Sequence, residues 1–231
     1  MKVMILAAGV GERMRPLTDH TPKPLLMAGG KPLLQWHVEN LVAAGFQDLV
    51  INVSHLGAQV MDFLGDGGRF NCQVHFSQEV EPLETAGGIV QALPLLGEEP
   101  FAVLNADIWC DYPLAELRET VREALQGGQH LAHLVFVDNP PQHGRGDFVL
   151  GEGGVVSLAD DSGSEALTYS GIAAFHPRFF AGIGAGKLPL RPILDSAIAR
   201  GVVSGEHYRG AWVDVGTPQR LQELDARLGL P

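Results

Sequence analysis

Residues 2–26 read KVMILAAGVGERMRPLTDHTPKPLL, an apolar run followed by a cationic loop. The first five residues are apolar apart from Lys2, and the turn after them contains Gly9 and Gly11. This pattern is typical of a buried strand that opens onto a loop. The remainder of the segment carries three prolines and offers no crossover helix. The segment therefore predicts a first strand followed directly by a long, stiffened loop.

Strand and helix patterns alternate through the rest of the chain. Residues 31–45 have apolar side chains at helical spacing, with Pro32 in the first turn and Gly45 as the C-terminal stop. Strands are also predicted at residues 48–53, 101–107 and 130–137, and helices at residues 113–125, 190–201 and 217–229. This alternation predicts a three-layer α/β/α fold, in which helices cover both faces of a mainly parallel sheet.

The second half of the chain departs from this alternation. Residues 146–160 alternate around a cluster of glycines, which predicts a hairpin, and residues 167–175 form a further predicted strand. A small antiparallel appendage to the mixed main sheet is therefore expected. No internal repeat or low-complexity linker divides the sequence, so residues 1–231 are predicted to form a single domain.

The composition excludes several classes of function. Apolar residues make up 45% of the 231 residues and charged residues 19%, which is typical of a globular protein. The net charge of −11 argues against a nucleic-acid partner, yet residues 1–31 carry five Lys or Arg against two Asp or Glu. Such a cationic focus suits a small anionic ligand. No apolar run is long enough to span a bilayer and nothing demands a disulfide, so a cytoplasmic protein without a membrane partner is expected.

Two familiar phosphate-binding motifs do not fit the turn at Gly9 and Gly11. A dinucleotide-binding turn needs a third glycine where Met14 stands, and the segment that follows supplies neither a crossover helix nor a second strand. A P-loop ends in Gly-Lys-Ser/Thr, which this segment lacks. A nicotinamide-dependent oxidoreductase is therefore opposed by the sequence.

The residue types in the loop suit a triphosphate instead. Gly9 and Gly11 allow backbone N–H groups to approach phosphate oxygens closely. Arg13 offers a planar fork of donors, and Lys23 a compact positive charge. Three prolines limit the freedom of the loop, so less entropy is lost when a ligand orders it.

GVGERMRPLT and TPKPL together resemble the signature of the sugar-1-phosphate nucleotidyltransferases, in which a Gly-x-Gly-x-Arg turn is followed by Pro-Lys-Pro. EPLETAGGI at residues 81–89, NAD at 105–107 and WVDVGTP at 212–218 resemble later segments of the same family, so the likeness covers the whole chain. The resemblance implies a Rossmann-like, GT-A-like fold whose antiparallel appendage contacts the sugar. It also implies that Arg13 and Lys23 are catalytic and stabilise phosphate charge.

Asp107 and Asp214 are the predicted metal ligands. Each follows a short apolar run that is predicted to form a strand. Strand ends of such a sheet open onto its ligand crevice, and carboxylate oxygens suit Mg²⁺. The histidines show no zinc-binding spacing that would offer a rival site. Together with the resemblance, this predicts that the two aspartates hold Mg²⁺ as the cofactor.

The resemblance places the nucleotide along two segments. The implied contacts are Leu6, Ala7, Ala8, Gly9, Gly11, Glu79, Leu83, Thr85, Gly87 and Gly88. Glu84 stands where relatives often have Gly, and Thr85 is predicted to cap a helix that begins at Ala86. The Glu79 carboxylate suits the N3–H of uracil or two donors of guanine. The residues therefore leave the base open, and the whole-chain likeness favours UTP.

The resemblance also implies a set of sugar contacts. These are Asn105, Gly146, Asp147, Ser170 and Gly171. Many relatives carry a Glu-Lys-Pro segment whose lysine is the usual partner of the sugar's own phosphate, but residues 157–171 contain no lysine. Arg145, Arg191 and Arg209 are the candidates to replace that lysine.

The activity implied by the resemblance is Mg²⁺-dependent transfer of a uridylyl group from UTP to a sugar 1-phosphate, with release of pyrophosphate. N-acetylmuramic acid 1-phosphate is the first-choice acceptor, which would place the reaction in peptidoglycan recycling. Mannose 1-phosphate with GTP, and glucose 1-phosphate with dTTP or UTP, are alternatives. A non-catalytic nucleotide-sugar sensor is the alternative of another class, but a sensor has little reason to keep both aspartates and both cations.

Overall fold

The computed structural model describes residues 1–125, 127–159 and 165–229. Its central sheet is built around β1 (Val3–Leu6), which lies between β4 (Asp48–Val53) and β6 (Phe101–Asn105). Both neighbours run parallel to β1, and β5 (Gln73–Gln78) extends the parallel part of the sheet beyond β4. The carboxyl ends of β1, β4 and β6 therefore meet at one edge of the sheet.

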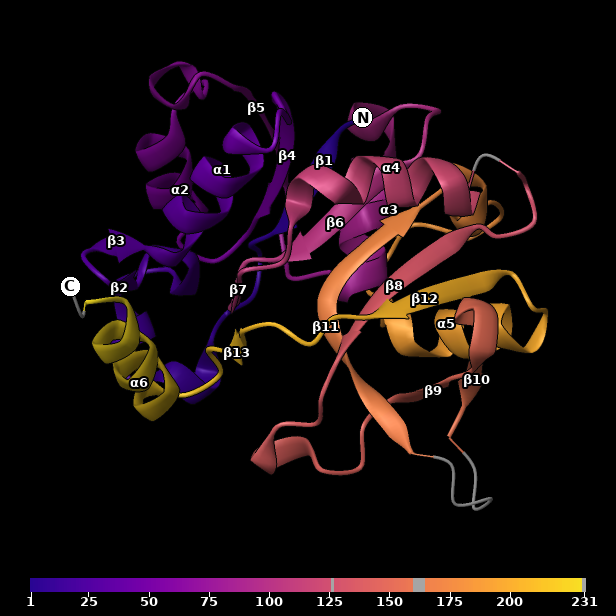
Figure 1. Ribbon diagram of the computed structural model, residues 1–231. Helices are drawn as coiled ribbons and strands as arrows, with labels where there is room; N and C mark the ends of the chain where they lie inside the picture. The colour runs from indigo at the N-terminus through magenta and orange to yellow at the C-terminus, as the bar shows by residue number, and fades with distance from the viewer. Residues whose placement is uncertain (126, 160–164, 230–231) are drawn as a thin grey trace.

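The other half of the sheet is mixed. β11 (Ala166–Phe175) runs antiparallel to β6, β8 (Ala132–Val137) runs antiparallel to β11, and β12 (Val203–His207) runs parallel to β8. The hairpin of β9 (Phe148–Leu150) and β10 (Val156–Leu158) pairs with the first residues of β11. Figure 1 shows this hairpin at one end of the sheet, and it confirms the predicted antiparallel appendage.

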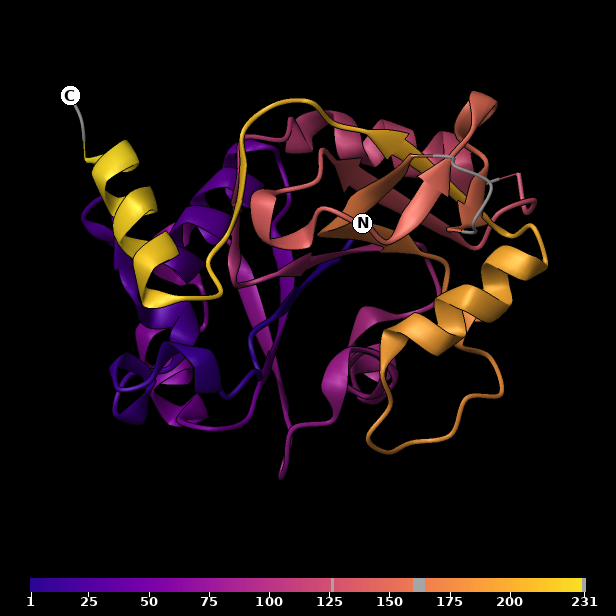
Figure 2. The same ribbon diagram turned by 90° about the horizontal axis from the view of Figure 1, so that it is seen from below.

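Helices cover both faces of the sheet because successive side chains of each strand point to opposite faces. Val3 and Ile5 of β1 pack against α1 (Leu33–Ala43), α2 (Gly57–Leu64) and α4 (Leu114–Leu125). Met4, between them, packs against α3 (Glu84–Leu96) and α5 (Leu190–Ala199). Figure 2 shows α4 and α5 on opposite sides of the sheet. The predicted three-layer arrangement is confirmed.

The C-terminal helix packs against the N-terminal loop. α6 (Pro218–Leu228) lies beside β2 (Met27–Ala28), which pairs with β3 (Lys31–Pro32), as Figure 1 shows. A separate apolar cluster fills this contact and consists of Met14, Leu26, Ala28, Leu33, Val215, Leu221 and Leu224. The Gly29 N–H also donates to Asp225 Oδ1 at 2.8 Å. The loop after β1 is thus held in place by a helix from the far end of the chain.

Short elements complete the fold. β7 (Ile108–Cys110) pairs antiparallel with β13 (Trp212–Asp214), which brings the segment before α6 to the end of β6. Single 3₁₀ turns lie at Glu12–Met14, Leu17–Asp19, Lys23–Leu25, Gly68–Phe70, Pro141–His143, Glu152–Gly154 and Pro177–Phe180. No helix in the described parts of the chain is long and apolar enough to cross a membrane.

One predicted helix start is wrong. α3 begins at Glu84, with Leu83 at the N-cap position, so Thr85 lies inside the first turn and cannot cap it. The carbonyl of Leu188 takes over this function, since it accepts the N–H groups of Ala86 and Gly87 at 3.0 and 3.1 Å. At the other end of the chain, Thr217 caps α6 as predicted and accepts the Arg220 N–H at 3.3 Å.

The other predicted elements match the observed ranges closely. The helices and strands that were not predicted are α2, β2, β3, β5, β7 and β12. Residue 160, at the end of the predicted hairpin, and residues 161–164, in the segment that lacks the expected lysine, lie outside the described residues.

Candidate functional site

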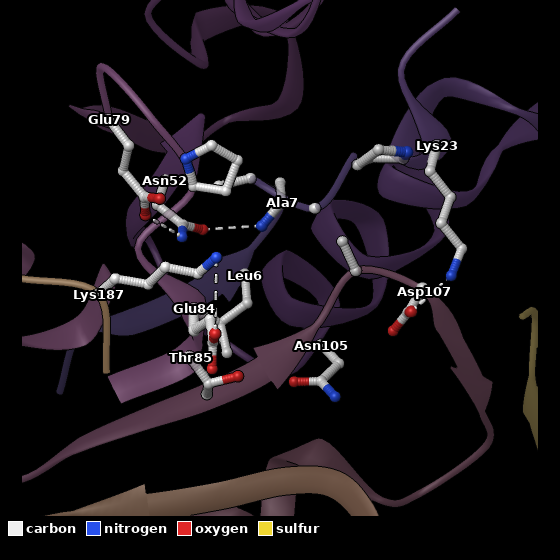
Figure 3. Close-up of a pocket in the computed structure, with 15 residues that line it drawn as sticks. Leu6, Ala7, Lys23, Asn52, Glu79, Glu84, Thr85, Asn105, Asp107 and Lys187 are labelled. Atoms are coloured by element: carbon white, nitrogen blue, oxygen red, sulfur yellow. Dashed lines mark hydrogen bonds and ion pairs between the residues drawn. The ribbon is translucent and has the colours of Figure 1, made fainter. Parts of the chain in front are cut away.

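The candidate site lies where the parallel strands end. Leu6, the last residue of β1, is in register with Asn52 of β4 on one side and with Asn105 of β6 on the other. A cavity of 310 Å³, here named cavity A, opens at this edge (Figure 3). Its lining residues are Leu6, Ala7, Ala8, Gly9, Lys23, Pro24, Asn52, Glu79, Pro82, Glu84, Thr85, Asn105, Ala106, Asp107 and Lys187.

A buried polar network fixes one wall of cavity A. Asn52 Oδ1 accepts the Ala7 N–H at 2.7 Å, and Asn52 Nδ2 donates to Glu79 Oε1 at 2.7 Å. Glu79 Oε2 accepts the Leu83 N–H at 2.9 Å. Asn52 and Glu79 are 3% and 6% exposed, so these bonds replace the water that both side chains lose on burial (Figure 3). The network ties the loop after β1 to the segment that leads into α3.

Asn52 was missed by the sequence analysis. The available signal was a single amide within the apolar strand at residues 48–53, next to the first strand of the sheet. An amide in a buried strand must find partners, but only the register of β1 with β4 identifies them.

Lys23 is one of two lysines that line cavity A. It lies between Pro22 and Pro24 at the start of a 3₁₀ turn, and its side chain is almost fully buried. Its Nζ contacts Asp107 Oδ2 at 2.5 Å (Figure 3). A buried ammonium needs such a partner because the loss of hydration is otherwise unfavourable. The structure therefore joins two residues that are 84 positions apart in the sequence.

The turn after β1 separates Gly9, Gly11 and Arg13. Gly9 lines cavity A, whereas Gly11 has a left-handed φ of +70° and faces Thr18, whose hydroxyl donates to the Gly11 carbonyl at 2.8 Å. Arg13 is exposed and points toward Gly216, where an added Cβ would lie 3.2 Å from Arg13 Nη2. Arg13 is not among the residues that line cavity A.

The two aspartates meet at a second opening. The pairing of β7 with β13 sets Asp214 opposite Ile108, and the Val215 N–H donates to the Asp107 carbonyl at 2.8 Å. Both aspartates line a cavity of 200 Å³, cavity C, with Asn105, Ile108, Pro140, Gln142, His143, Thr168, Tyr169, Ser170 and Trp212. Within the described residues, no group of three or more His, Cys, Asp or Glu side chains is arranged to hold a metal ion. Any metal here would depend on two carboxylates plus ligands from outside the chain.

Asp214 has a cationic partner that the sequence analysis missed. Arg220 Nη1 contacts Asp214 Oδ2 at 2.9 Å from the first turn of α6. The approach requires Gly216, because an added Cβ there would lie 2.3 Å from Arg220 Nη2. The glycine in WVDVGTP therefore allows the arginine to reach the aspartate.

His37 supports the loop that carries Asp107. It lies on α1, and burial lowers the pKa of its imidazole to about 4, against opposing effects of backbone hydrogen bonds at Ile108 and Ala106 and of the Asp107 charge. The imidazole is consequently neutral at neutral pH. Its Nε2 has no hydrogen-bond partner among the described residues.

Glu84 and the glycines of α3 shape the opposite wall. Glu84 has a left-handed φ of +60°, a conformation that glycine adopts without strain. Gly87 and Gly88 permit close packing. An added Cβ at Gly87 would lie 2.2 Å from the Gly186 carbonyl oxygen, and one at Gly88 would lie 2.7 Å from Glu79 Oε1. These glycines, like Leu83, lie behind the cavity surface and are not among its lining residues.

A third opening, cavity B, has a volume of 350 Å³ and shares Glu84, Thr85 and Asn105 with cavity A. Its other lining residues are Asp147, Phe148, Tyr169, Pro189, Leu190, Arg191 and Leu194. Asp147 Oδ2 accepts the Tyr169 N–H at 2.9 Å, which fixes the carboxylate at the cavity wall. Asn105 lines all three cavities and marks the point where they meet.

The remaining predicted sugar contacts have structural settings of their own. Gly146 has a φ of +64°, and an added Cβ would lie 2.5 Å from the Ala166 carbonyl. Gly171 has a φ of +85° and packs against Asn105, and buried Ser170 accepts the Ile172 N–H at 3.1 Å. Of these three residues, Ser170 lines cavity C.

The cations near the site differ from those expected. Arg191 lines cavity B, whereas Arg145 and Arg209 are exposed and line none of cavities A, B and C. Lys187 was not predicted, yet it lines cavity A, and its Nζ lies 3.8 Å from Glu84 Oε1 (Figure 3). The arrangement can bind an anionic ligand between Lys23 and Lys187, beside a pair of carboxylates.

Comparison with known proteins gives this arrangement a context. Residues 2–229 match the protein family described as "Nucleotidyl transferase". The chain belongs to this family. The N-acetylmuramate alpha-1-phosphate uridylyltransferase of Neisseria meningitidis serogroup B is 47% identical to it, with 99% of each chain covered. A protein of the same name from Caulobacter vibrioides is 34% identical, over 97% of this chain and 96% of its own.

The fold agrees with membership of the nucleotidyl transferase family. A crystal structure of a candidate glucose-1-phosphate thymidylyltransferase from Bacillus anthracis, in complex with sucrose, superposes with a TM-score of 0.85. It covers 99% of this chain and 95% of its own at 21% identity, so this likeness concerns the fold. The resemblance seen in GVGERMRPLT and TPKPL is thus confirmed, and the roles of individual residues stay predictions.

Proposed function

We propose that the chain transfers a uridylyl group from UTP to N-acetylmuramic acid 1-phosphate, forming a UDP-sugar and pyrophosphate. The observation that carries this proposal is the 47% identity, over 99% of both chains, to a protein named for that reaction. A second relative of the same name at 34% identity supports it. N-acetylmuramic acid is a peptidoglycan sugar, so we assign the reaction to peptidoglycan recycling, in a single cytoplasmic domain.

In this proposal the nucleotide occupies cavity A and the sugar extends into cavities B and C. The three cavities meet at Asn105, so two substrates can approach each other there. Each carboxylate oxygen has two lone pairs, and Glu79 can therefore keep its bonds to Asn52 and Leu83 and still accept the N3–H of uracil. The network described above would fix Glu79 for this contact.

The reaction needs no protein base. A sugar phosphate is mostly dianionic at neutral pH, because its second pKa is about 6. One of its oxygens can attack the α-phosphorus of UTP directly while pyrophosphate leaves from the opposite side. We assign Lys23 and Arg13 to stabilising the negative charge that develops. Lys23 already lies in cavity A, and Arg13 must swing from the vicinity of Gly216 to reach the phosphates.

The residues present fit a bound Mg²⁺. Asp107 and Asp214 line the same cavity, and Mg²⁺ commonly takes one or two carboxylates and completes its shell with water and phosphate oxygens. When bound, the ion would supply positive charge to the phosphates. Lys23 and Arg220 pair with one carboxylate each and so fix both side chains beside this position.

The test is a substrate panel. The protein is incubated with UTP, GTP or dTTP and with each of three acceptors, namely the 1-phosphates of N-acetylmuramic acid, mannose and glucose, and pyrophosphate is measured. We expect release with UTP and N-acetylmuramic acid 1-phosphate that depends on Mg²⁺. Release from another pair alone would replace the proposed substrates, and no release from any pair would favour a nucleotide-sugar sensor.

A matched pair of variants tests the assignment of Asp107. Asp107→Asn should lower kcat for the proposed pair by at least roughly 100-fold while the protein stays folded. Asp62→Asn, an exposed change on α2, should leave kcat unchanged. Wild-type turnover in Asp107→Asn would remove this residue from the mechanism.

A further inference from the structure

Cavity B contains one strong cation. Among the described residues that line it, Arg191 is the only lysine or arginine, and the acids Glu84 and Asp147 line the same cavity. Arg191 lies in the first turn of α5, where the backbone dipole of the helix also favours an anion. This opening is therefore the part of the site where a negatively charged substituent of a sugar would find a partner.

The guanidinium of Arg191 is held in place, but most of its hydrogen-bond donors have no acceptor among the described residues. Its Nε donates to Asp195 Oδ1 at 2.7 Å, and its Cζ lies 4.4 Å from the centre of the buried Phe148 ring. Nη1 comes only within 3.9 Å of Asp147 Oδ1, which is beyond hydrogen-bond distance. No described residue accepts a hydrogen bond from either terminal nitrogen. Four of the five N–H donors of this side chain thus stay available to a ligand.

Asp147 forms a loose ion pair with Arg191 but no hydrogen bond to those donors. One of its oxygens accepts the Tyr169 N–H at 2.9 Å, and the other lies 3.1 Å from His143 Nε2. The carboxylate is therefore fixed by neighbours on its own side of the cavity. The edge formed by Nη1 and Nη2 of Arg191 can then receive a second carboxylate in the paired geometry that guanidinium favours.

The acceptor in the proposed reaction carries such a group. N-acetylmuramic acid 1-phosphate differs from N-acetylglucosamine 1-phosphate by a lactyl ether, which ends in a carboxylate. Asn105 lines both cavity A and cavity B, so a sugar whose phosphate is bound near Lys23 and Asp107 can extend a ring substituent toward cavity B. We infer, on the basis of the proposed function, that Arg191 binds the lactyl carboxylate and selects this acceptor over the sugar that lacks it.

The two sugars provide the test. Binding of UDP-N-acetylmuramic acid and UDP-N-acetylglucosamine to the full chain is measured by calorimetry for wild type, Arg191→Gln and Arg191→Lys. We expect wild type to prefer the lactyl-bearing compound, and Arg191→Gln to reduce that preference by roughly 10- to 100-fold. Arg191→Lys, which keeps the charge but not the planar fork, should fall between them. The same change in preference should appear in kcat/KM for the two sugar 1-phosphates.

Controls separate this inference from the proposed function. Arg200→Gln, an exposed change at the other end of α5, should leave the preference unchanged, and melting curves should show each variant folded. Equal binding of both compounds by wild type, or a preference retained in folded Arg191→Gln, overturns the inference while uridylyl transfer can still stand. If wild type binds neither compound and turns over neither sugar phosphate, the proposed function itself fails.

Discussion

At the scale of single residues, Glu84 shows how the site departs from local preference. Its left-handed backbone is unfavourable for any residue with a Cβ, and a glycine at this position would remove the strain. Yet the glutamate side chain lines both cavity A and cavity B and pairs loosely with Lys187. Strain retained beside two cavities points to a role in ligand binding rather than in folding.

Glu84→Gly should therefore raise the free energy of unfolding by about 0.5–1 kcal/mol, since glycine adopts the left-handed conformation freely. Glu123→Gly, in the regular helix α4, is the matched control and should lower stability by about 1 kcal/mol. Urea denaturation measures both. A loss of stability in Glu84→Gly equal to that of the control would show that the backbone at this position is not strained.

At the scale of elements, the position of the N-terminal loop depends on α6. Leu221 and Leu224 of this helix pack with Met14, Leu26 and Leu33 beneath the loop that carries Lys23. The loop contains only 3₁₀ turns and a two-residue strand, so it has little hydrogen bonding of its own. A helix from the end of the chain thus supplies the apolar contact that a crossover helix would normally provide.

Leu224→Ala should destabilise the protein by about 2–5 kcal/mol, because it opens a cavity in this small cluster. Since the cluster holds the loop, we also expect KM for UTP to rise in the variant at temperatures where it stays folded. Gln222→Ala, on the exposed face of the same helix, should change stability by less than about 0.5 kcal/mol. An unchanged KM for UTP in folded Leu224→Ala would show that the position of the loop does not depend on packing against α6.

The elements that the sequence predicts are those with a strong pattern. The apolar strands at residues 48–53 and 101–107 were predicted because burial on both faces needs continuous apolar residues, and they correspond to β4 and β6. β5 lies at the edge of the sheet and is mostly polar, and β12 includes Gly205, which packs against the Phe136 ring. β5 contains only Val74 and Phe76 as apolar residues and β12 only Val203, so neither strand has a strong pattern, and each forms by pairing with its partner strand.

The same reasoning explains the candidate site. Gly9, Lys23, Asp107 and Asp214 stand in short motifs and could be predicted from them. Asn52, Lys187 and Arg220 have no motif, and their importance follows only from which side chains they contact after folding. The cap of α3 could not be predicted for the same reason. The Leu188 carbonyl, and not Thr85, accepts the first N–H groups of the helix, and Leu188 comes from a distant loop.

At the scale of the whole molecule, the central claim is that distant segments form one metal-dependent centre. Asp107 follows β6, whereas Asp214 ends β13, and the pairing of β7 with β13 brings both to cavity C. Lys23, from the N-terminal loop, contacts the first aspartate, and Arg220, from α6, contacts the second. The three-layer fold thereby connects the beginning, middle and end of the chain at the edge of one sheet.

The most direct measurement is a crystal structure with a non-hydrolysable UTP analogue and Mn²⁺, with anomalous data collected to locate the metal. The account predicts one anomalous peak that contacts carboxylates of both Asp107 and Asp214 and a phosphate oxygen, with Lys23 turned from Asp107 to the phosphates. A peak on the phosphates alone, with Lys23–Asp107 and Arg220–Asp214 still paired, would contradict it.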